Sequence, residues 1–206
     1  MKWIFSFAVL FLFSCAENHT ESNPEKLDTQ KITPVLKKGA VNPYAPVDVS
    51  PMDMAYFPTD YPVKKMSNAE AQPPLARVIY SRPQKQGRPV FGSLLKYGEP
   101  WRLGANEATE IEFFSPATIQ GKKVAKGRYI LYCIPQAESW IVIFNTNTDS
   151  WGLHADPAKD VHRFTIPVQK SSAAIEFFTM SFAKTESGAD LIMAWDNMVA
   201  RLPLQF

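Results

Sequence analysis

The sequence predicts an all-β fold, an antiparallel sandwich or jelly-roll-like barrel of about nine short strands, preceded by an irregular arm. From Leu75 onward, short runs rich in β-branched and aromatic residues recur between Gly, Pro, Asn and Asp. Several runs alternate, as Phe164, Ile166 and Val168 do with their polar neighbours, which is the period of a half-buried strand. No stretch shows a long helical period. The predicted strands are 76–81, 109–114, 118–120, 128–134, 140–145, 162–168, 175–183, 190–196 and 199–203.

Residues 1–14 have the size and charge order of a secretory signal peptide. Lys2 gives a positive start, and residues 3–13 are apolar except for Ser6. This run is shorter than the roughly 20 apolar residues of a membrane-spanning helix. The Leu-Phe-Ser-Cys ending resembles the lipobox of bacterial lipoproteins, in which the cysteine sulfur receives a diacylglyceryl group and the cysteine becomes the new N-terminus. An ordinary cleaved signal with an incidental Cys15 is the alternative.

Lipidation at Cys15 decides where we expect the protein to work. Two acyl chains, such as palmitate, anchor a protein stably, whereas one chain holds it only marginally. We therefore expect a membrane-anchored lipoprotein of the cell envelope, at its periplasmic or surface face. The membrane is then a partner, through the lipid on Cys15.

Two segments separate the signal from the β domain. Residues 15–49 are polar and contain four prolines, which predicts a flexible tether. In residues 50–74, side chains such as Met52, Tyr56 and Phe57 are too apolar to leave in water, and prolines preclude a long helix. We expect an extended arm that packs on the domain, with 63–74 as a loop.

The β domain is predicted to span 75–206. Gln120-Gly121-Lys122-Lys123 is typical of a tight hairpin turn, and 125–128 of a second turn before a strand. Asp196-Asn197 is expected to link the last two strands, and 91–97 to form one turn of helix.

Composition excludes some function classes. The chain has 22 basic and 20 acidic side chains and a net charge of +2, which lacks the strongly basic character of a nucleic-acid-binding protein. Its apolar content of 46% is ample for a packed core. If Cys15 carries lipid, no disulfide can form within the chain, and Cys133, in an apolar run, is expected to be a small buried hydrophobe.

The densest cluster of chemical groups is Trp-Arg-Leu-Gly-Ala-Asn-Glu-Ala-Thr at 101–109, called the motif loop below. In a functional interpretation, Glu107 is a general acid or base, and Arg102 and Asn106 bind a carboxylate, a phosphate or a sugar hydroxyl. In a structural interpretation, Arg102 and Glu107 form a partly buried ion pair, Asn106 satisfies loop backbone groups, and Trp101 belongs to the core.

Several motifs resemble domain-of-unknown-function family 2911. The resemblance covers about residues 50–206, and 50–55 resembles the N-terminal extension of the Bacteroidetes-type members. It implies an exported bacterial protein of mostly β structure, but it implies no activity and no catalytic residue. The resembling residues are Tyr80-Ser81-Arg82-Pro83, Gly87-Arg88, Phe91-Gly92, the motif loop, Gly121-Lys122-Lys123, Gly127-Arg128-Tyr129, Ile134-Pro135, Trp140, Trp151-Gly152, Asp160, Arg163 and Trp195.

The first functional hypothesis is a non-enzymatic β domain that binds a small molecule, a glycan or an envelope protein. Binding sites often lie on loops carried by a rigid sheet, which favours the motif loop. Arg82 and Arg88 lie in another loop, 81–88, which is basic. Both are expected to have partners, because they border apolar runs. The predicted ligand-binding residues are Arg82, Trp101, Arg102, Asn106 and Glu107.

Two alternatives remain at this stage. One is a glycan or ester hydrolase, with Glu107 as acid or base and a second carboxylate such as Asp160 or Asp196 nearby. The other is a purely structural lipoprotein, in which the motif loop serves folding alone.

No metal or other cofactor is predicted. His154 and Asp156, with Asp160 and His162, supply ligand types that suit Zn²⁺, but their spacing fits no strong metal motif. A polar loop leading into the edge of a sheet is the simpler interpretation.

Overall fold

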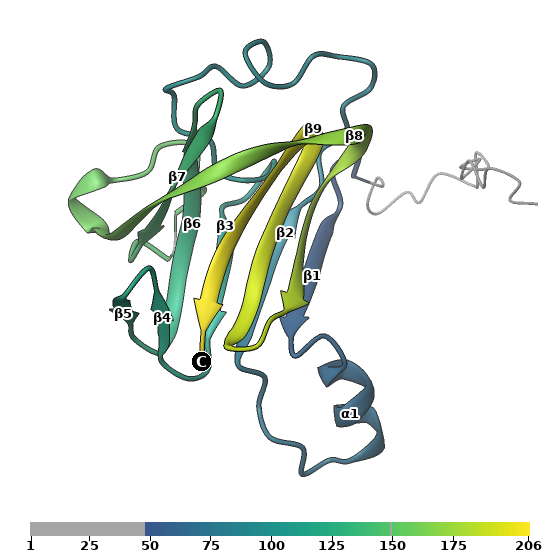
Figure 1. The fold of residues 1–206 in the computed structure, drawn as a ribbon, viewed down its shortest axis with the longest axis vertical. Helices are drawn as coiled ribbons and strands as arrows, with labels where there is room; N and C mark the ends of the chain where they lie inside the picture. Colours follow the sequence, from purple (N-terminus) through teal and green to yellow (C-terminus); the bar gives the residue numbers. More distant parts are fainter. Residues whose placement is uncertain (1–47, 149) are drawn as a thin grey trace, which may run out of the picture. The chain divides into compact units, whose positions relative to one another are not determined.

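Nine antiparallel strands form one sheet in the computed structural model, which describes residues 48–148 and 150–206 (Figure 1). The signal peptide, Cys15 and residues 15–47 of the tether lie outside the described residues. The elements are β1 (Met52–Phe57), α1 (Tyr61–Ser67), β2 (Ala76–Ser81), β3 (Thr109–Phe113), β4 (Ala117–Ile119), β5 (Lys122–Val124), β6 (Gly127–Pro135), β7 (Ser139–Asn145), the 3₁₀ turn Pro157–Lys159, β8 (Asp160–Lys184) and β9 (Gly188–Gln205).

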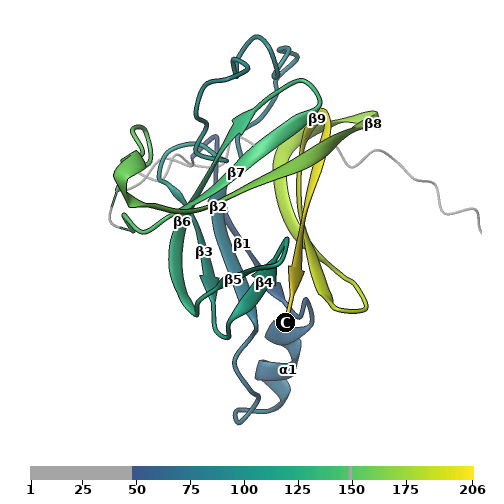
Figure 2. The ribbon, with the colours of Figure 1, turned by 60° about the vertical axis from the view of Figure 1, so that its left-hand side comes forward.

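The strand order is β1-β2-β3-β6-β7-β8-β9-β4-β5, and the sheet does not close. The first part of β8 pairs with β7, from Asp160 to Pro167, and the rest pairs with β9. Figures 1 and 2 show β8 and β9 crossing over the layer that contains β2, β3 and β6. The sheet therefore folds over itself as a sandwich, and the all-β prediction is confirmed.

The core lies between these two layers because alternate side chains of each strand point inward. Val78 of β2, Ile111 of β3 and Leu131 of β6 are fully buried. Phe178 of β8 and Leu191 of β9 are also fully buried. Burial of an aliphatic or aromatic side chain of this size contributes about 1.5–3 kcal/mol to folding.

The last four predicted strands form two long strands instead. Runs 162–168 and 175–183 both belong to β8, and runs 190–196 and 199–203 both belong to β9. The pairing between β8 and β9 shifts register around Ile175, which lies opposite Asp196. Asp196 has a φ of 50°. A bulge of this kind bends a strand without ending it. The predicted Asp196-Asn197 turn is therefore an irregularity inside β9.

The segment predicted as an irregular arm is more regular than expected. Met52–Phe57 forms β1, which pairs with β2 along its whole length. Pro62 is compatible with α1 because it occupies the first turn, where its missing N–H costs no hydrogen bond. Asp60 and Lys64 form an ion pair of 2.9 Å along the same helix. No helix in the described part of the chain is long and apolar enough to cross a membrane.

Two predicted turns are confirmed and one predicted helical turn is wrong. Gln120 and Gly121 join β4 to β5, with φ of 48° and 76°. Residues 125–126 separate β5 from β6. Residues 91–97 form no helix, since Phe91 and Leu95 pair in an isolated bridge. This segment belongs to the long connection from β2 to β3, which loops over one end of the sheet (Figure 1).

Candidate functional site

The motif loop is fastened to the sheet at both of its ends. The backbone of Trp101 exchanges two hydrogen bonds with that of Cys133 in β6, at 2.7 and 2.9 Å. The indole Nε1 of Trp101 donates to the carbonyl of Gly104, and the hydroxyl of Thr109 donates to the carbonyl of Leu103. Leu103 has a φ of 52°, which is uncommon for a residue with a large side chain. Such a conformation persists only where its surroundings fix it, so the loop is rigidly held.

Two glycines let the motif loop pack closely against its neighbours. A Cβ on Gly104 would lie 3.1 Å from the hydroxyl of Thr109 and 3.2 Å from the carbonyl oxygen of Ser81. Gly152 has a φ of 90°, and a Cβ there would lie 2.8 Å from the Cα of Ala108. The loop around 152 therefore lies directly on the motif loop.

An aromatic cluster supports the motif loop from inside the sandwich. The ring of Trp101 stacks on Trp195 of β9, with centroids 5.7 Å apart. It also contacts Phe178 of β8 edge-on at 4.9 Å and Trp140 of β7 at 5.9 Å. Trp101 is only 7% exposed, which confirms the interpretation that it belongs to the core. It is also part of the cavity wall described next.

A cavity of about 520 Å³ lies beside residues 101–105. Its walls come from the motif loop, the connection after β2, the segment before β1, the loop around 152 and the start of the bulge in β9. The lining residues are Val49, Ser50, Pro83, Gln84, Gln86, Arg88, Leu94, Leu95, Pro100, Trp101, Arg102, Gly104, Ala105, Gly152, Leu153 and Trp195.

The charged lining residues of this cavity are both arginines. Arg88 donates from Nε to the carbonyl of Lys85 and from one terminal nitrogen to the carbonyl of Gln84. Arg102 is partly buried, and its Nε is buried without a hydrogen-bond partner among the described residues. No ion pair joins Arg102 to another described residue. Within the described residues, the cavity therefore has a lining arginine, Arg102, with a buried donor that makes no hydrogen bond.

Two of the predicted site residues in the motif loop, Asn106 and Glu107, do not line the cavity. Glu107 is exposed, and it forms no ion pair with Arg102, so the structural interpretation of these two residues as a partly buried ion pair is wrong. Asn106 donates to the carboxylate of Asp48 at 2.5 Å instead of satisfying its own loop. The left-handed φ of 57° at Asn106 turns the chain between Arg102 and Glu107.

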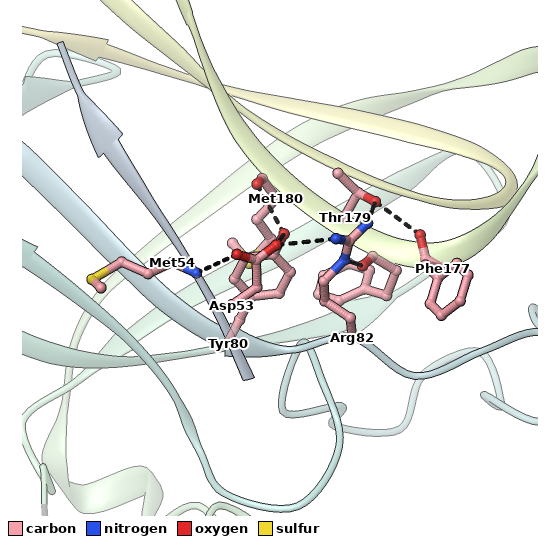
Figure 3. A network of polar contacts seen from close by, with 8 residues as sticks. Asp53, Met54, Tyr80, Arg82, Phe177, Thr179 and Met180 are labelled. Carbon is pink, nitrogen blue, oxygen red and sulfur yellow. Dashed lines mark hydrogen bonds and ion pairs between the residues drawn. The ribbon is translucent and has the colours of Figure 1, made fainter. Parts of the chain in front are cut away.

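Arg82 belongs to a separate polar network that joins β1 to β8 (Figure 3). Its guanidinium lies 3.2 Å from the carboxylate of Asp53 and donates to the Thr179 hydroxyl and the Phe178 carbonyl. The Tyr80 hydroxyl bridges Asp53 and the carbonyl of Met180. Burial raises the pKa of Tyr80, so its hydroxyl stays protonated as a donor. Arg82 thus has the partners expected for it, and it does not line the cavity.

A comparison with protein families shows to which family the chain belongs. Residues 62–204 match a family described as protein of unknown function (DUF2911), which is more than half of the chain. The chain belongs to this family. No curated protein and no solved structure matches it. The DUF2911 match includes the motif loop, Arg88 and Trp195, which confirms the resemblance to the family over residues 62–204; the resemblance of 50–55 to an N-terminal extension lies outside the match.

A second polar network of this DUF2911 domain surrounds Asp160, at the start of β8. Its carboxylate accepts from the Tyr132 hydroxyl at 2.9 Å and from the Asn145 amide at 2.8 Å, and lies 3.2 Å from Arg163. Burial, followed by the bond to Asp160, raises the pKa of Tyr132 to about 12. Because its oxygens are engaged by several donors, Asp160 holds the loop before β8 in place.

The residues considered for a metal are dispersed in the same region. Asp156 accepts from the Ala158 amide at the start of the 3₁₀ turn. His162 packs against Phe164 with their rings stacked 5.8 Å apart. The described residues contain no group of three His, Cys, Asp or Glu side chains that could hold a metal ion. Cys133 is fully buried, as expected, and burial raises the pKa of its thiol.

Sequence reasoning found part of the cavity. Trp101 and Arg102 were predicted as site residues and line it together. Trp195, Arg88 and Leu153 also line it, although they were not among the predicted ligand-binding residues. Arg88 and Trp195 were both among the residues that resembled the family, which was the available signal.

Proposed function

We propose that this protein is a non-enzymatic, lipid-anchored domain of the cell envelope that binds a small organic ligand beside the motif loop. The observation that carries the proposal is the cavity of about 520 Å³ lined by Trp101 and Arg102. Ligand sites commonly have volumes of about 300–1,000 Å³ and apolar walls with a few placed polar groups. The indoles of Trp101 and Trp195 and the side chain of Leu95 supply the apolar wall.

The rigidity of the wall favours binding. The motif loop is held by backbone bonds to β6, by the Thr109 hydroxyl and by the tight contact with Gly152. A preformed wall loses little conformational freedom when a ligand arrives, which improves affinity. Arg102, placed on this loop, has donors to offer without first breaking an ion pair in the described part of the chain.

The two alternatives receive less support. A glycosidase needs two carboxyl groups at the cleft, and the cavity is lined by no described Asp or Glu. Glu107 is exposed and outside it. If the motif loop were purely structural, we would expect its charged side chains to form an ion pair with each other. Arg102 and Glu107 do not pair. The binding hypothesis uses the groups that the other two leave unexplained.

Ligand binding in the cavity is tested with two fluorescent probes, the anionic anilinonaphthalene sulfonate and the neutral phenylnaphthylamine. We expect at least one to bind the folded protein with a stoichiometry of one. Ala105→Trp, which places an indole in the cavity, should weaken that binding at least about tenfold. Ala125→Trp is the matched control, because Ala125 is exposed in the turn before β6. Equal affinity for the wild type and Ala105→Trp, with both variants folded by near-ultraviolet circular dichroism, would overturn the proposal.

The lipid anchor rests on the sequence around Cys15 and is tested separately. We expect mass spectrometry of the membrane-bound protein to find an acylated cysteine at the mature N-terminus. Cys15→Ser should move the protein to the soluble fraction, while Cys133→Ser should leave it in the membrane, since that thiol is buried in β6. An unmodified Cys15 in the mature chain would refute the anchor without affecting the ligand site.

A further inference from the structure

We infer that the ligand is an organic anion with two parts, an oxyanion head, such as a carboxylate or a phosphate, and an apolar body. This inference rests on the proposed function and names the chemical class that the same cavity takes. It comes from the pairing of the arginines, from the unused donors of Arg102 and from the apolar mouth of the cavity.

The pairing of the arginines singles out this cavity. Five of the seven described arginines lie within 4.0 Å of a carboxylate: Arg77 with Glu112, Arg82 with Asp53, Arg128 with Glu110, Arg163 with Asp160 and Arg201 with Asp190. Arg88 and Arg102 have no carboxylate partner among the described residues, and both line the cavity. Within the described residues, the domain thus pairs its other arginines with carboxylates, and the two arginines that it leaves without one both line the same cavity.

The surroundings of these two arginines favour an oxyanion over another ligand. No described lining residue is acidic, so the cavity carries an excess of positive charge. The buried Nε of Arg102 has no hydrogen-bond partner in the described part of the chain, and a buried donor without an acceptor is costly. Arg77 has an unpartnered Nε as well, but its guanidinium is already neutralised by Glu112. A carboxylate or phosphate head accepts two parallel hydrogen bonds from a guanidinium and would supply the missing acceptor.

Exposed apolar side chains that line the cavity favour a ligand with an apolar body as well as an oxyanion head. Leu94 is 45% exposed, Leu153 is 63% exposed and Val49 is 69% exposed, and all three line the cavity. Trp101 and Trp195 lie among the lining residues further inside the fold. An exposed cluster of large apolar side chains around a pocket is typical of a ligand-binding groove. Inorganic phosphate alone would leave these surfaces uncovered.

The ligand class is tested by calorimetry with four compounds that separate head from body. Decanoate and decyl phosphate carry both parts, decanol carries the body alone, and inorganic phosphate carries the head alone. We expect decanoate or decyl phosphate to bind at least about tenfold more tightly than decanol and inorganic phosphate, since a hydrogen bond to a charged group is strong. Comparison of the first two compounds identifies the preferred head.

Substitution of single arginines tests whether Arg88 and Arg102 bind the oxyanion head of the ligand. Arg102→Gln and Arg88→Gln should each weaken the better anion at least about tenfold and leave decanol nearly unchanged. Arg128→Gln is the control, because Arg128 has a carboxylate partner at 3.8 Å in β3 and lies outside the cavity. Thermal unfolding of each variant confirms that it is folded.

The outcomes separate this inference from the proposed function. If decanol binds as tightly as decanoate and decyl phosphate, or if the two cavity arginines can be replaced without effect, the ligand class is wrong. If inorganic phosphate binds as tightly as decanoate and decyl phosphate, the inference that the ligand has an apolar body is wrong. In these cases, sensitivity to Ala105→Trp would still support a cavity site. If no compound or probe responds to Ala105→Trp, both the inference and the proposed function fail.

Discussion

The indole rings of Trp101 and Trp195 stack with their centroids 5.7 Å apart and their planes 25° apart. This contact joins the motif loop to β9, which lies between β8 and β4 in the strand order. Trp195 is also anchored by a hydrogen bond from its Nε1 to the carbonyl of Glu176 in β8. Since both rings line the cavity, the floor of the candidate site is also part of the hydrophobic core.

Trp101→Ala should therefore destabilise the whole domain. Removal of a buried Trp from a core costs about 3–5 kcal/mol, because the neighbours do not fully collapse into the space. Trp151→Ala is the control, since Trp151 is 56% exposed and its loss should change stability by less than about 0.5 kcal/mol. Urea denaturation at neutral pH measures both. Equal stability of the two variants would contradict the role of Trp101 as a common wall of core and cavity.

Arg82→Gln should lower stability without affecting the cavity. Arg82 gives hydrogen bonds to the Phe178 carbonyl and the Thr179 hydroxyl besides its ion pair with Asp53. We expect a loss of about 1–3 kcal/mol for Arg82→Gln. Asp53→Asn should cost about 0.2–1 kcal/mol, because the ion pair that it removes is partly exposed and the amide oxygen of Asn can still accept a hydrogen bond. Denaturation of the two variants measures the difference, and a loss of probe binding by folded Arg82→Gln would return Arg82 to the ligand site.

The strands of the domain were largely predictable because alternation reports a half-buried strand directly. The length of β8 and β9 was not, since a bulge at Ile175 and Asp196 has the same sequence signal as a turn. The strand β1 was missed for a different reason. Met52 and Met54 point outward at the edge of the sheet and remain about half exposed, so the segment has no clean alternation of apolar and polar residues.

The candidate site was predictable only in part, because closeness in sequence does not fix direction. Arg102 and Glu107 are five positions apart in one loop, but the left-handed residues Leu103 and Asn106 between them redirect the chain. Arg102 lines the cavity, whereas Glu107 faces solvent. Trp195 reaches the same cavity from β9 through the folding of the sheet, which no local pattern encodes.

Glu107→Gln should have almost no effect on stability. Breaking a buried ion pair would cost about 3–5 kcal/mol, because it leaves an uncompensated charge. Glu107 is exposed and has no hydrogen-bond or ion-pair partner within the described residues, so we expect a change within about 0.5 kcal/mol. Probe binding should also persist. A large loss of stability in urea denaturation would revive the structural interpretation of this carboxylate.

Gly152→Ala should be far more damaging than Gly121→Ala. Both glycines have a positive φ, of 90° and 76°, so both substitutions carry the same kind of backbone strain. The added Cβ meets open space at Gly121, but at Gly152 it would lie 2.8 Å from the Cα of Ala108. We expect about 1 kcal/mol for Gly121→Ala, and at least about 2 kcal/mol for Gly152→Ala because of the clash with the backbone. Thermal unfolding measures the two shifts, and equal shifts would show that the loop around 152 yields easily.

The acid stability of the domain should depend on His162. Burial, with a smaller contribution from the charge of Lys122, lowers the pKa of His162 in the folded protein. Below the unfolded pKa of about 6.5, His162 is therefore protonated in the unfolded chain but still neutral in the folded chain. The stability of the fold then falls as the pH decreases. The loss should level off once the folded His162 also becomes protonated. Because glutamine does not titrate, the stability of His162→Gln relative to the wild type should improve between pH 7.5 and pH 5.5, the window of this proton uptake. Urea denaturation across this range measures the difference. A constant difference between His162→Gln and the wild type would show that burial of the imidazole against Phe164 does not resist its protonation.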